Sequence, residues 1–256
     1  MGTPSNRPRF ALILPAAGSG QRLGESIPKP YLSIAGRTIL EHTLQPFVDT
    51  GALVHVVIPT EKNYIQTAKQ CVASSFPALS FDVIQGGKER QYSIEKGLDA
   101  MKNAGIDAQW VAVHDAVRPF ITVDEIQRCL DAAVQFGAAI IAVPAKDTIK
   151  MVDLDSDQSL KTEKISDYKM VAHRIEDTPP RAQCWQAQTP QIFDSSLLKQ
   201  AYENARELSI VGTDDASLVE ALGRDVYVVE GRRENFKITY PIDLTLTRWL
   251  LEGEDN

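Results

Sequence analysis

The segment from residue 14 to residue 30 combines glycines and cations in a way that suits polyphosphate binding. It carries three glycines and two cations: Gly18, Gly20, Gly24, Arg22 and Lys29. Glycines let backbone N–H groups approach a ligand closely, and consecutive N–H groups form a nest that binds anions. Because Arg and Lys side chains add positive charge to such a nest, the segment predicts a phosphate-binding loop.

Two common phosphate-binding loops do not match this spacing. The loop of nucleoside triphosphatases has Gly-Lys-Ser/Thr entering a helix, whereas Lys29 lies between Pro28 and Pro30, which cannot open a helix in that way. The dinucleotide fingerprint has the spacing G-x-G-x-x-G, and here one residue too many separates Gly20 from Gly24. From this segment alone, a surface loop without a ligand remains the alternative.

A second glycine-containing segment follows the apolar run 80–84. Gly86 and Gly87 precede Arg90 and Ser93 at the expected start of a helix. The two glycines permit close approach of a ligand, and the Arg and Ser side chains could reach a base, a ribose or a phosphate. A turn followed by an ordinary helix start would explain the same residues.

Asp115 and Arg118 follow the apolar run 110–114. An acidic residue at the end of a strand, beside a polyphosphate loop, is well placed to touch Mg²⁺ directly or through water. Arg118 can make a forked contact to a phosphate. A salt-bridged Asp–Arg turn is the alternative, and we interpret His114 as a hydrogen-bonded core histidine rather than a base. Thr213 is expected to cap a helix with two acids in its first turn, which needs no ligand.

The elements that must position these residues alternate between strand and helix patterns. Short apolar runs cover residues 10–14, 53–58, 80–84, 110–114, 138–143 and 225–229. Apolar residues share a helix face in three sets: Leu40, Leu44, Phe47 and Val48; Ile94, Leu98 and Met101; Ile126, Leu130 and Val134. Further helices are expected at 195–208, at 213–222 and from Pro241, and residues 122–125 form a capping box.

This alternation predicts an α/β fold with a mostly parallel twisted sheet and helices on both faces. Right-handed crossovers then place the loops after residues 14, 84, 114 and 143 along one edge of the sheet. The alternation breaks at residues 147–186, where turn-rich and alternating patterns predict a projecting β-hairpin arm. A hairpin alone is marginal in water, so we expect it to pack on a partner subunit.

Composition limits the remaining possibilities. The chain has 256 residues and a net charge of −7, so its composition does not predict a broad basic surface that binds nucleic acid. No apolar run approaches the roughly 18 residues of a membrane span. The three cysteines form neither a CxxC metal-binding motif nor an even-numbered disulfide framework. The N-terminus lacks the apolar middle of a secretory signal. We expect a cytoplasmic protein with a disordered tail at 1–9 and a single domain at 10–256, with residues 147–186 inserted as a dimerisation arm.

Taken together, the motifs resemble those of the 2-C-methyl-D-erythritol 4-phosphate cytidylyltransferase family, a group of nucleotidyltransferases with a Rossmann-like fold. The resemblance covers residues 10 to about 250. It rests on Pro-Ala-Ala-Gly (15–18), Pro-Lys (28–29), Gly-Gly-x-Glu-Arg (86–90), His-Asp-x-x-Arg-Pro (114–119), Asp-Thr-Ile-Lys (147–150), Gln-Thr-Pro-Gln (188–191), Thr-Asp-x-Ala (213–216) and Gly-Arg followed by Asn-x-Lys-x-Thr (231–232 and 235–239).

The resemblance implies transfer of CMP from CTP to 2-C-methyl-D-erythritol 4-phosphate, with release of pyrophosphate and with Mg²⁺, by a homodimer with interlocking arms. The residues it assigns to CTP binding are Ala16, Ala17, Gly18, Gly86, Arg90 and Ser93. Those it assigns to the reacting phosphates are Arg22, Lys29 and Lys237. Those it assigns to the acceptor pocket are Asp115, Arg118, Thr189, Thr213 and Lys237, with Thr148 and Arg181 arriving from the partner's arm. The segment between Thr148 and Arg181 is longer than in the family pattern.

Three other functions stay open at this point. The first is the same chemistry on ribitol 5-phosphate, whose family shares most of these motifs. The second is a non-catalytic nucleotide-binding module, which the presence of both Arg22 and Lys29 argues against. The third is a dinucleotide oxidoreductase, which predicts NAD(P)H binding.

Overall fold

The structure is a computed structural model that describes residues 8–17, 27–159 and 171–253. Seven strands form one sheet in the order β11-β7-β10-β6-β1-β4-β5. Their bounds are β1 (Phe10–Ile13), β4 (Leu53–Thr60), β5 (Phe81–Gln85), β6 (Trp110–Val113), β7 (Ala138–Pro144), β10 (Trp185–Asp194) and β11 (Tyr227–Glu230). Residues 1–7 of the tail expected at 1–9, and the expected site residues Gly18 and Arg22, lie outside the described residues.

The pairings of this sheet are parallel except those of β10, which runs antiparallel to both β6 and β7. The mostly parallel sheet is therefore confirmed, and six of its strands follow the expected apolar runs. The sequence reasoning missed β10, because its first half, Trp185 to Thr189, alternates glutamines with small residues instead of forming an apolar run. The register with β7 shifts between Ala187 and Gln191.

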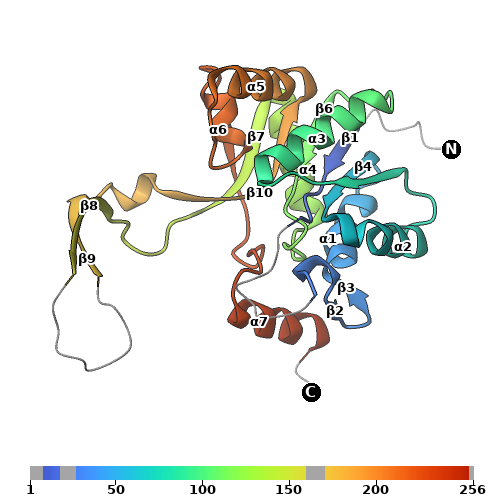
Figure 1. Ribbon diagram of the computed structural model, residues 1–256, viewed down its shortest axis with the longest axis horizontal. Helices are drawn as coiled ribbons and strands as arrows, with labels where there is room; N and C mark the ends of the chain where they lie inside the picture. Colours follow the sequence, from blue (N-terminus) through green and yellow to red (C-terminus); the bar gives the residue numbers. More distant parts are fainter. Residues whose placement is uncertain (1–7, 18–26, 160–170, 254–256) are drawn as a thin grey trace.

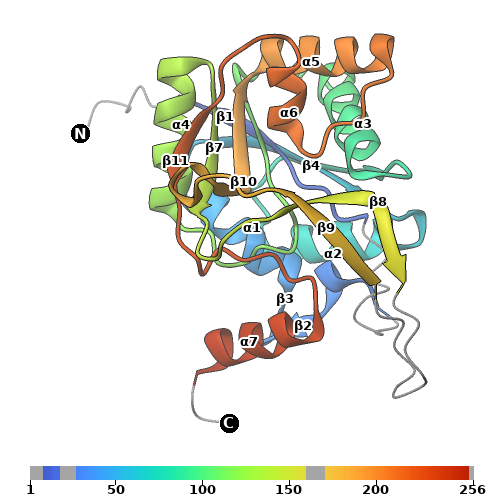
Figure 2. The same ribbon diagram turned by 90° about the vertical axis from the view of Figure 1, so that its left-hand side faces the viewer.

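Helices cover both faces of the sheet, as expected (Figures 1 and 2). One face carries α1 (Ile39–Asp49), α2 (Ile65–Ser75) and α4 (Val123–Phe136), and the other carries α3 (Arg90–Asn103), α5 (Ser195–Leu208) and α6 (Asp215–Glu220). Capping boxes begin α1 at Thr38 and α4 at Thr122. Each box satisfies backbone donors that the first turn of a helix leaves without partners.

Two expectations about these helices were wrong. Ile126 and Leu130 are buried as expected, but Val134 is 42% exposed, and Cys129 and Ala133 complete the buried side of α4. Thr213 does not cap α6: the N-cap is Asp214, whose carboxylate accepts a hydrogen bond from the Ser217 N–H. A carboxylate at this position also suits the positive end of the helix dipole.

The last helix, α7 (Pro241–Glu252), begins at the expected proline and lies apart from both helical layers (Figure 1). It packs against the small hairpin of β2 (Ser33–Ile34) and β3 (Arg37–Thr38) through a cluster that includes Ile34, Ile238 and Leu244. This cluster joins the chain around Lys29 to the chain that follows Lys237.

The expected hairpin projects from the end of the sheet as β8 (Met151–Ser159) and β9 (Val171–Asp177), which pair antiparallel (Figure 1). The Ala145 N–H donates to the Cys184 carbonyl at 2.9 Å and marks where the arm leaves the sheet. We call residues 145–184 the arm. Among the described residues, no helix is long and apolar enough to cross a membrane.

Candidate functional site

The loops that follow β1, β4 and β5 pack tightly at one edge of the sheet. The Gly86 N–H donates to the Thr60 carbonyl at 2.8 Å. A Cβ on Gly86 would lie 2.8 Å from the Ala17 Cβ and 3.0 Å from the Ser93 Oγ. Since real Cβ atoms do not approach so closely, this position requires glycine. The structure thus brings Ala17, Gly86 and Ser93 together, and Ala16 directly precedes Ala17 in the segment after β1.

Ser93 has a structural contact that the sequence did not reveal. Its hydroxyl accepts a hydrogen bond from the Gly87 N–H at 3.0 Å and donates to the Glu89 carbonyl at 3.1 Å. The side chain is buried and fixes the turn that leads from β5 into α3. A contact of Ser93 with a nucleotide remains a prediction.

Asp115, the second residue after β6, is the centre of a cluster of cations. Its carboxylate oxygens lie 3.2 Å from Arg90 Nε, 3.2 Å from Arg118 Nε and 3.2 Å from Lys237 Nζ. Its backbone N–H donates to Thr189 Oγ1 at 3.1 Å. The structure therefore gathers five of the expected site residues, from α3, the loop after β6, β10 and the segment after β11. We call Asp115, Arg90, Arg118 and Lys237 the Asp115 cluster.

The charges of this cluster do not cancel. Burial on its own would raise the pKa of Asp115, but Lys237, Arg90 and Arg118 outweigh it and hold this pKa well below its usual range. The carboxylate is therefore ionised at neutral pH. Arg90 makes a second ion pair, to Asp215, so three cations face two carboxylates. The remaining positive charge favours an anionic ligand at this edge of the sheet.

Lys29 meets the chain that follows Lys237. Its ammonium donates to the carbonyls of Ile238 at 3.3 Å and Thr239 at 2.8 Å. The short helix that it begins, η2 (Lys29–Tyr31), is held by a 2.5 Å hydrogen bond between the Tyr31 hydroxyl and Thr60 Oγ1. Burial raises the pKa of Tyr31 to about 12, so this hydroxyl keeps its proton. Two of the expected catalytic cations thus lie on adjoining segments.

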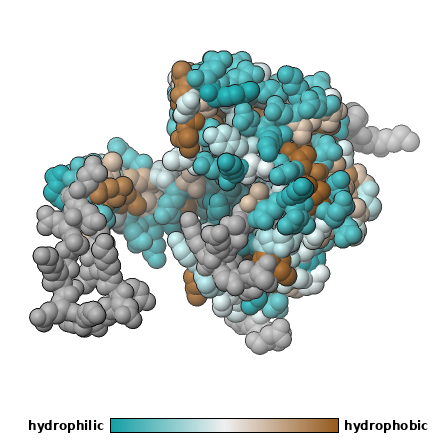
Figure 3. Space-filling model, viewed as in Figure 1, coloured by the Kyte–Doolittle hydropathy of each residue, from teal (hydrophilic) through white to brown (hydrophobic). Residues whose placement is uncertain are grey.

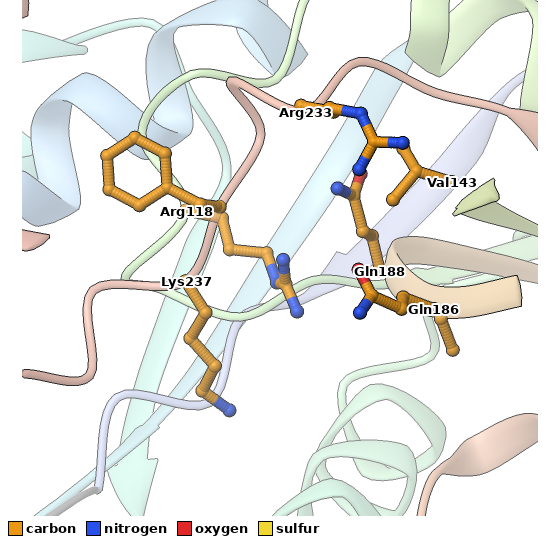
Figure 4. A pocket seen from close by; sticks show the side chains of 8 residues that line it. Arg118, Val143, Gln186, Gln188, Arg233 and Lys237 are labelled. Atoms are coloured by element: carbon orange, nitrogen blue, oxygen red, sulfur yellow. The ribbon is translucent and has the colours of Figure 1, made fainter. Parts of the chain in front are cut away.

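A cavity of about 280 Å³ opens beside the Asp115 cluster. Figure 4 shows the side chains of Arg118 and Lys237 on one side and those of Gln186, Gln188 and Arg233 on the other. Cations and amides together suit a ligand that carries a phosphate and hydroxyl groups. The sequence reasoning missed the last three residues. Gln188 belongs to the Gln-Thr-Pro-Gln motif (188–191), which could have indicated its role, whereas Gln186 and Arg233 are not among the motif residues named above.

Asn235 organises the wall of this cavity. Its amide donates to Gln188 Oε1 at 3.0 Å and to the Thr189 carbonyl at 2.9 Å. Arg118 Nη1 donates to the Asn235 carbonyl at 2.8 Å. Asn235 is fully buried, so these hydrogen bonds tie β10 to the segment that carries Lys237 in a water-poor environment.

Three further expected residues, Thr213, Thr148 and Arg181, are exposed in the part of the chain that the structure describes. Thr213 is exposed before α6. Thr148 and Arg181 are exposed in the arm, where Arg181 Nη1 donates to the Lys146 carbonyl at 3.4 Å. Because the arm projects from the body (Figure 1), a role for these two residues requires that the arm reaches another subunit.

His114 is a buried, hydrogen-bonded histidine, as expected. Its Nδ1 pairs with Thr189 Oγ1 at 2.9 Å and its Nε2 with the Arg118 carbonyl at 3.2 Å. Burial lowers the pKa of His114 to about 3. The ring is therefore neutral at physiological pH, and it positions Thr189 and the turn before Arg118.

This burial predicts a pH effect on stability. The imidazole can bind a proton in the unfolded chain below about pH 6.5 but stays neutral in the fold down to about pH 3. Lowering the pH from 7 to 5 should therefore cost about 2 kcal/mol of unfolding free energy through His114 alone. Urea unfolding of the wild type and His114→Gln at both pH values measures the difference. An equal pH response in the two proteins would contradict it.

Comparisons with known proteins agree on one family. The model of the 2-C-methyl-D-erythritol 4-phosphate cytidylyltransferase family matches residues 10–253. The protein of that name from Geotalea uraniireducens (strain Rf4) is 40% identical over 251 residues, which cover 96% of this chain and 97% of the relative. The one from Halalkalibacterium halodurans is 36% identical over 246 residues, with 96% and 98% covered.

Solved structures are similar over the same range. The crystal structure of 2-C-methyl-D-erythritol 4-phosphate cytidylyltransferase from Thermus thermophilus matches with a TM-score of 0.70 and 32% identity, covering 96% of this chain and all of that one. The structure of 4-diphosphocytidyl-2C-methyl-D-erythritol synthase from Anaerococcus prevotii matches with a TM-score of 0.77 and 27% identity, covering 96% and 99%.

Proposed function

The chain belongs to the 2-C-methyl-D-erythritol 4-phosphate cytidylyltransferase family, and on that premise we propose that it transfers CMP from CTP to 2-C-methyl-D-erythritol 4-phosphate. The products are 4-diphosphocytidyl-2-C-methyl-D-erythritol and pyrophosphate, in isoprenoid precursor biosynthesis. One observation carries the proposal beyond family membership. The excess of positive charge at Asp115 lies between the loops assigned to CTP and the cavity assigned to the acceptor.

The reaction needs charge neutralisation more than proton transfer. A phosphate oxygen of the acceptor attacks the α-phosphorus of CTP in line with the bond to the departing pyrophosphate. The attacking phosphate is already anionic at neutral pH, so the step requires no general base, and His114 is too deeply buried to serve as one. Repulsion between two anions is the main obstacle. Fixed cations lower it by neutralising and aligning both reactants.

The position of each cation indicates which substrate it would contact. Arg118 and Lys237 line the cavity and would hold the acceptor phosphate. Lys29 lies at the end of the glycine-containing loop, where it would face the triphosphate together with Arg22. Arg90 opens α3 beside Gly86, between the two substrates.

We also propose Mg²⁺ as the cofactor. Among the described residues, no group of three or more His, Cys, Asp or Glu side chains could hold a metal by itself. Mg²⁺ is commonly bound by one or two carboxylates together with substrate phosphates, and Asp115 is such a carboxylate. Both of its oxygens already meet cations, so a contact through water fits better than a direct one. The ion would offset charge on the triphosphate.

The arm supports a homodimer. Met151, Val152, Leu154 and Ile175 are exposed apolar side chains on it, and Figure 3 shows apolar surface on its described part. A two-stranded ribbon with such a surface is marginal in water unless it packs on something else. A partner subunit is the occupant that would also bring Thr148 and Arg181 to an acceptor pocket.

This arrangement makes a prediction about mixed dimers. Arg181→Ala should raise the KM for the acceptor, because the acceptor loses a cation. Arg181→Ala and Asp115→Asn subunits, refolded together, form dimers in which one site combines the intact Asp115 with the partner's intact Arg181. Activity at low acceptor concentration should then recover to about a quarter of wild type. An unchanged acceptor KM, or no recovery on mixing, would contradict the arm's role.

One assay tests the function itself. Purified protein is incubated with CTP, Mg²⁺ and either 2-C-methyl-D-erythritol 4-phosphate or ribitol 5-phosphate, and pyrophosphate release is followed. We expect release with the methylerythritol phosphate. Faster release with ribitol 5-phosphate would assign the protein to the other acceptor. No release with either substrate, despite CTP binding, would indicate a non-catalytic nucleotide-binding module.

A further inference from the structure

The guanidinium of Arg90 is held between two carboxylates. Its Nε lies 3.2 Å from Asp115 Oδ1, and its Nη2 lies 2.8 Å from Asp215 Oδ2. A guanidinium is a rigid planar fork, so contacts on two of its nitrogens fix both its position and its plane. Neither contact uses Nη1, whose N–H groups can therefore meet a substrate oxygen.

Asp215 is itself an anchored group. Its side chain is fully buried, and its Oδ1 accepts a hydrogen bond from the Tyr202 hydroxyl at 2.5 Å. Burial and the Asp215 charge raise the pKa of Tyr202, which keeps this donor protonated. The Asp215 and Ala216 N–H groups donate to Gln191 Oε1 at 3.1 and 3.0 Å. The carboxylate is thus fixed by side chains from α5 and β10 as well as by α6.

Asp115 alone would not fix the orientation of Arg90. Its carboxylate also attracts Arg118 and Lys237, which line the acceptor cavity. Held only by Asp115, the Arg90 side chain would be free to rotate about that single contact. The second ion pair removes this freedom. A buried carboxylate with a fixed position is the part of such a pair that orients its partner.

We propose that Asp215, supported by Tyr202 and Gln191, is a positioning residue that fixes Arg90 for binding of the CTP triphosphate. The inference rests on the proposed function, which assigns Arg90 to CTP. It adds a charged residue in α6, remote from Arg90 in sequence, to the groups that determine nucleotide affinity. Asp215 acts through Arg90 and does not touch the substrate.

The test is a double-mutant cycle on CTP binding. In Asp215→Asn the side-chain shape is kept, but an amide N–H can face Arg90 Nη2, where two donors cannot pair. We expect the Kd and KM for CTP to rise about 10-fold while kcat falls less than about 3-fold. Tyr202→Phe keeps the ion pair and should raise the Kd about 2- to 3-fold. In an Arg90→Ala background, Asp215→Asn should add less than about 2-fold.

Two readouts separate positioning from a structural role. Asp194→Ala removes the N-cap of α5 at the opposite end of β10 and should lower the Tm without changing the Kd for CTP. Calorimetric titration with CTP and Mg²⁺, without the acceptor, gives the Kd independently of turnover. If the protein binds CTP but forms no product when the acceptor is added, the proposed function is refuted while the positioning role of Asp215 can still be tested. An unchanged Kd in Asp215→Asn, or an equal loss with and without Arg90, would overturn the positioning role. If Asp215→Asn does not fold, Tyr202→Phe in both Arg90 backgrounds decides by the same criterion.

Discussion

Replacing Lys29 with alanine should lower kcat on the order of 10²–10³-fold, with a smaller effect on the KM for CTP. A fixed cation near the triphosphate contributes most where negative charge develops, on the departing pyrophosphate. The structure adds a second reason. The Lys29 ammonium is hydrogen-bonded to the carbonyls of residues 238 and 239, so its loss also releases the segment that carries Lys237.

Steady-state kinetics at saturating acceptor, with CTP varied, measures this effect. Lys62→Ala is the matched control, because Lys62 also begins a short helix, η3 (Lys62–Tyr64), and is exposed. It should behave as wild type. Turnover of Lys29→Ala close to that of the control would reject a catalytic role for Lys29. We expect a similar fall for Arg22→Ala, at a position outside the described residues.

Replacing Asp115 with asparagine should lower kcat/KM for the acceptor on the order of 10²–10³-fold, because removal of one partner from a buried ion pair is strongly unfavourable. Three cations lie 3.2 Å from the carboxylate oxygens. Without this carboxylate they repel one another, and an asparagine amide presents a donor to at least one of them. The cations that should align the two phosphates would then move apart.

Kinetics and thermal unfolding together test this second expectation. Asp107→Asn provides the control, because Asp107 is exposed before the start of β6, at the end of the strand away from the site. It should change neither kcat/KM nor the Tm, whereas Asp115→Asn should lower both. Retention of kcat/KM by Asp115→Asn would show that the cations keep their positions without the carboxylate.

Much of the fold could be predicted because burial on both faces leaves a direct trace in the sequence. Parallel strands such as β7 are apolar along their length, and the helices carry apolar residues at helical spacing. The strand β10 left no such trace: it places Gln186, Gln188 and Thr189 at the site edge of the sheet. The polar side chains that face the site interrupt the apolar pattern there, so the pattern did not predict this strand.

The candidate site was predictable only in part, for a related reason. Asp115 and Arg118 follow a strand, so their place at the edge of the sheet follows from topology. The pairing of Arg90 with Asp215 depends on the tertiary arrangement that brings the first residue of α3 to the first residue of α6, and no local pattern encodes that. The two acids at the start of α6 were explained by the helix dipole, with Thr213 as the cap, whereas Asp214 is the cap and the buried Asp215 pairs with Arg90.

The central claim is that the cations around Asp115, together with Lys29, bring two anionic substrates together. A crystal structure of the protein with CTP, Mg²⁺ and 2-C-methyl-D-erythritol 4-phosphate tests it most directly. We expect the triphosphate against the loop that ends at Lys29 and against Arg90, with the acceptor phosphate between Arg118 and Lys237. Phosphates bound elsewhere, with these four side chains left in contact only with protein, would contradict the claim.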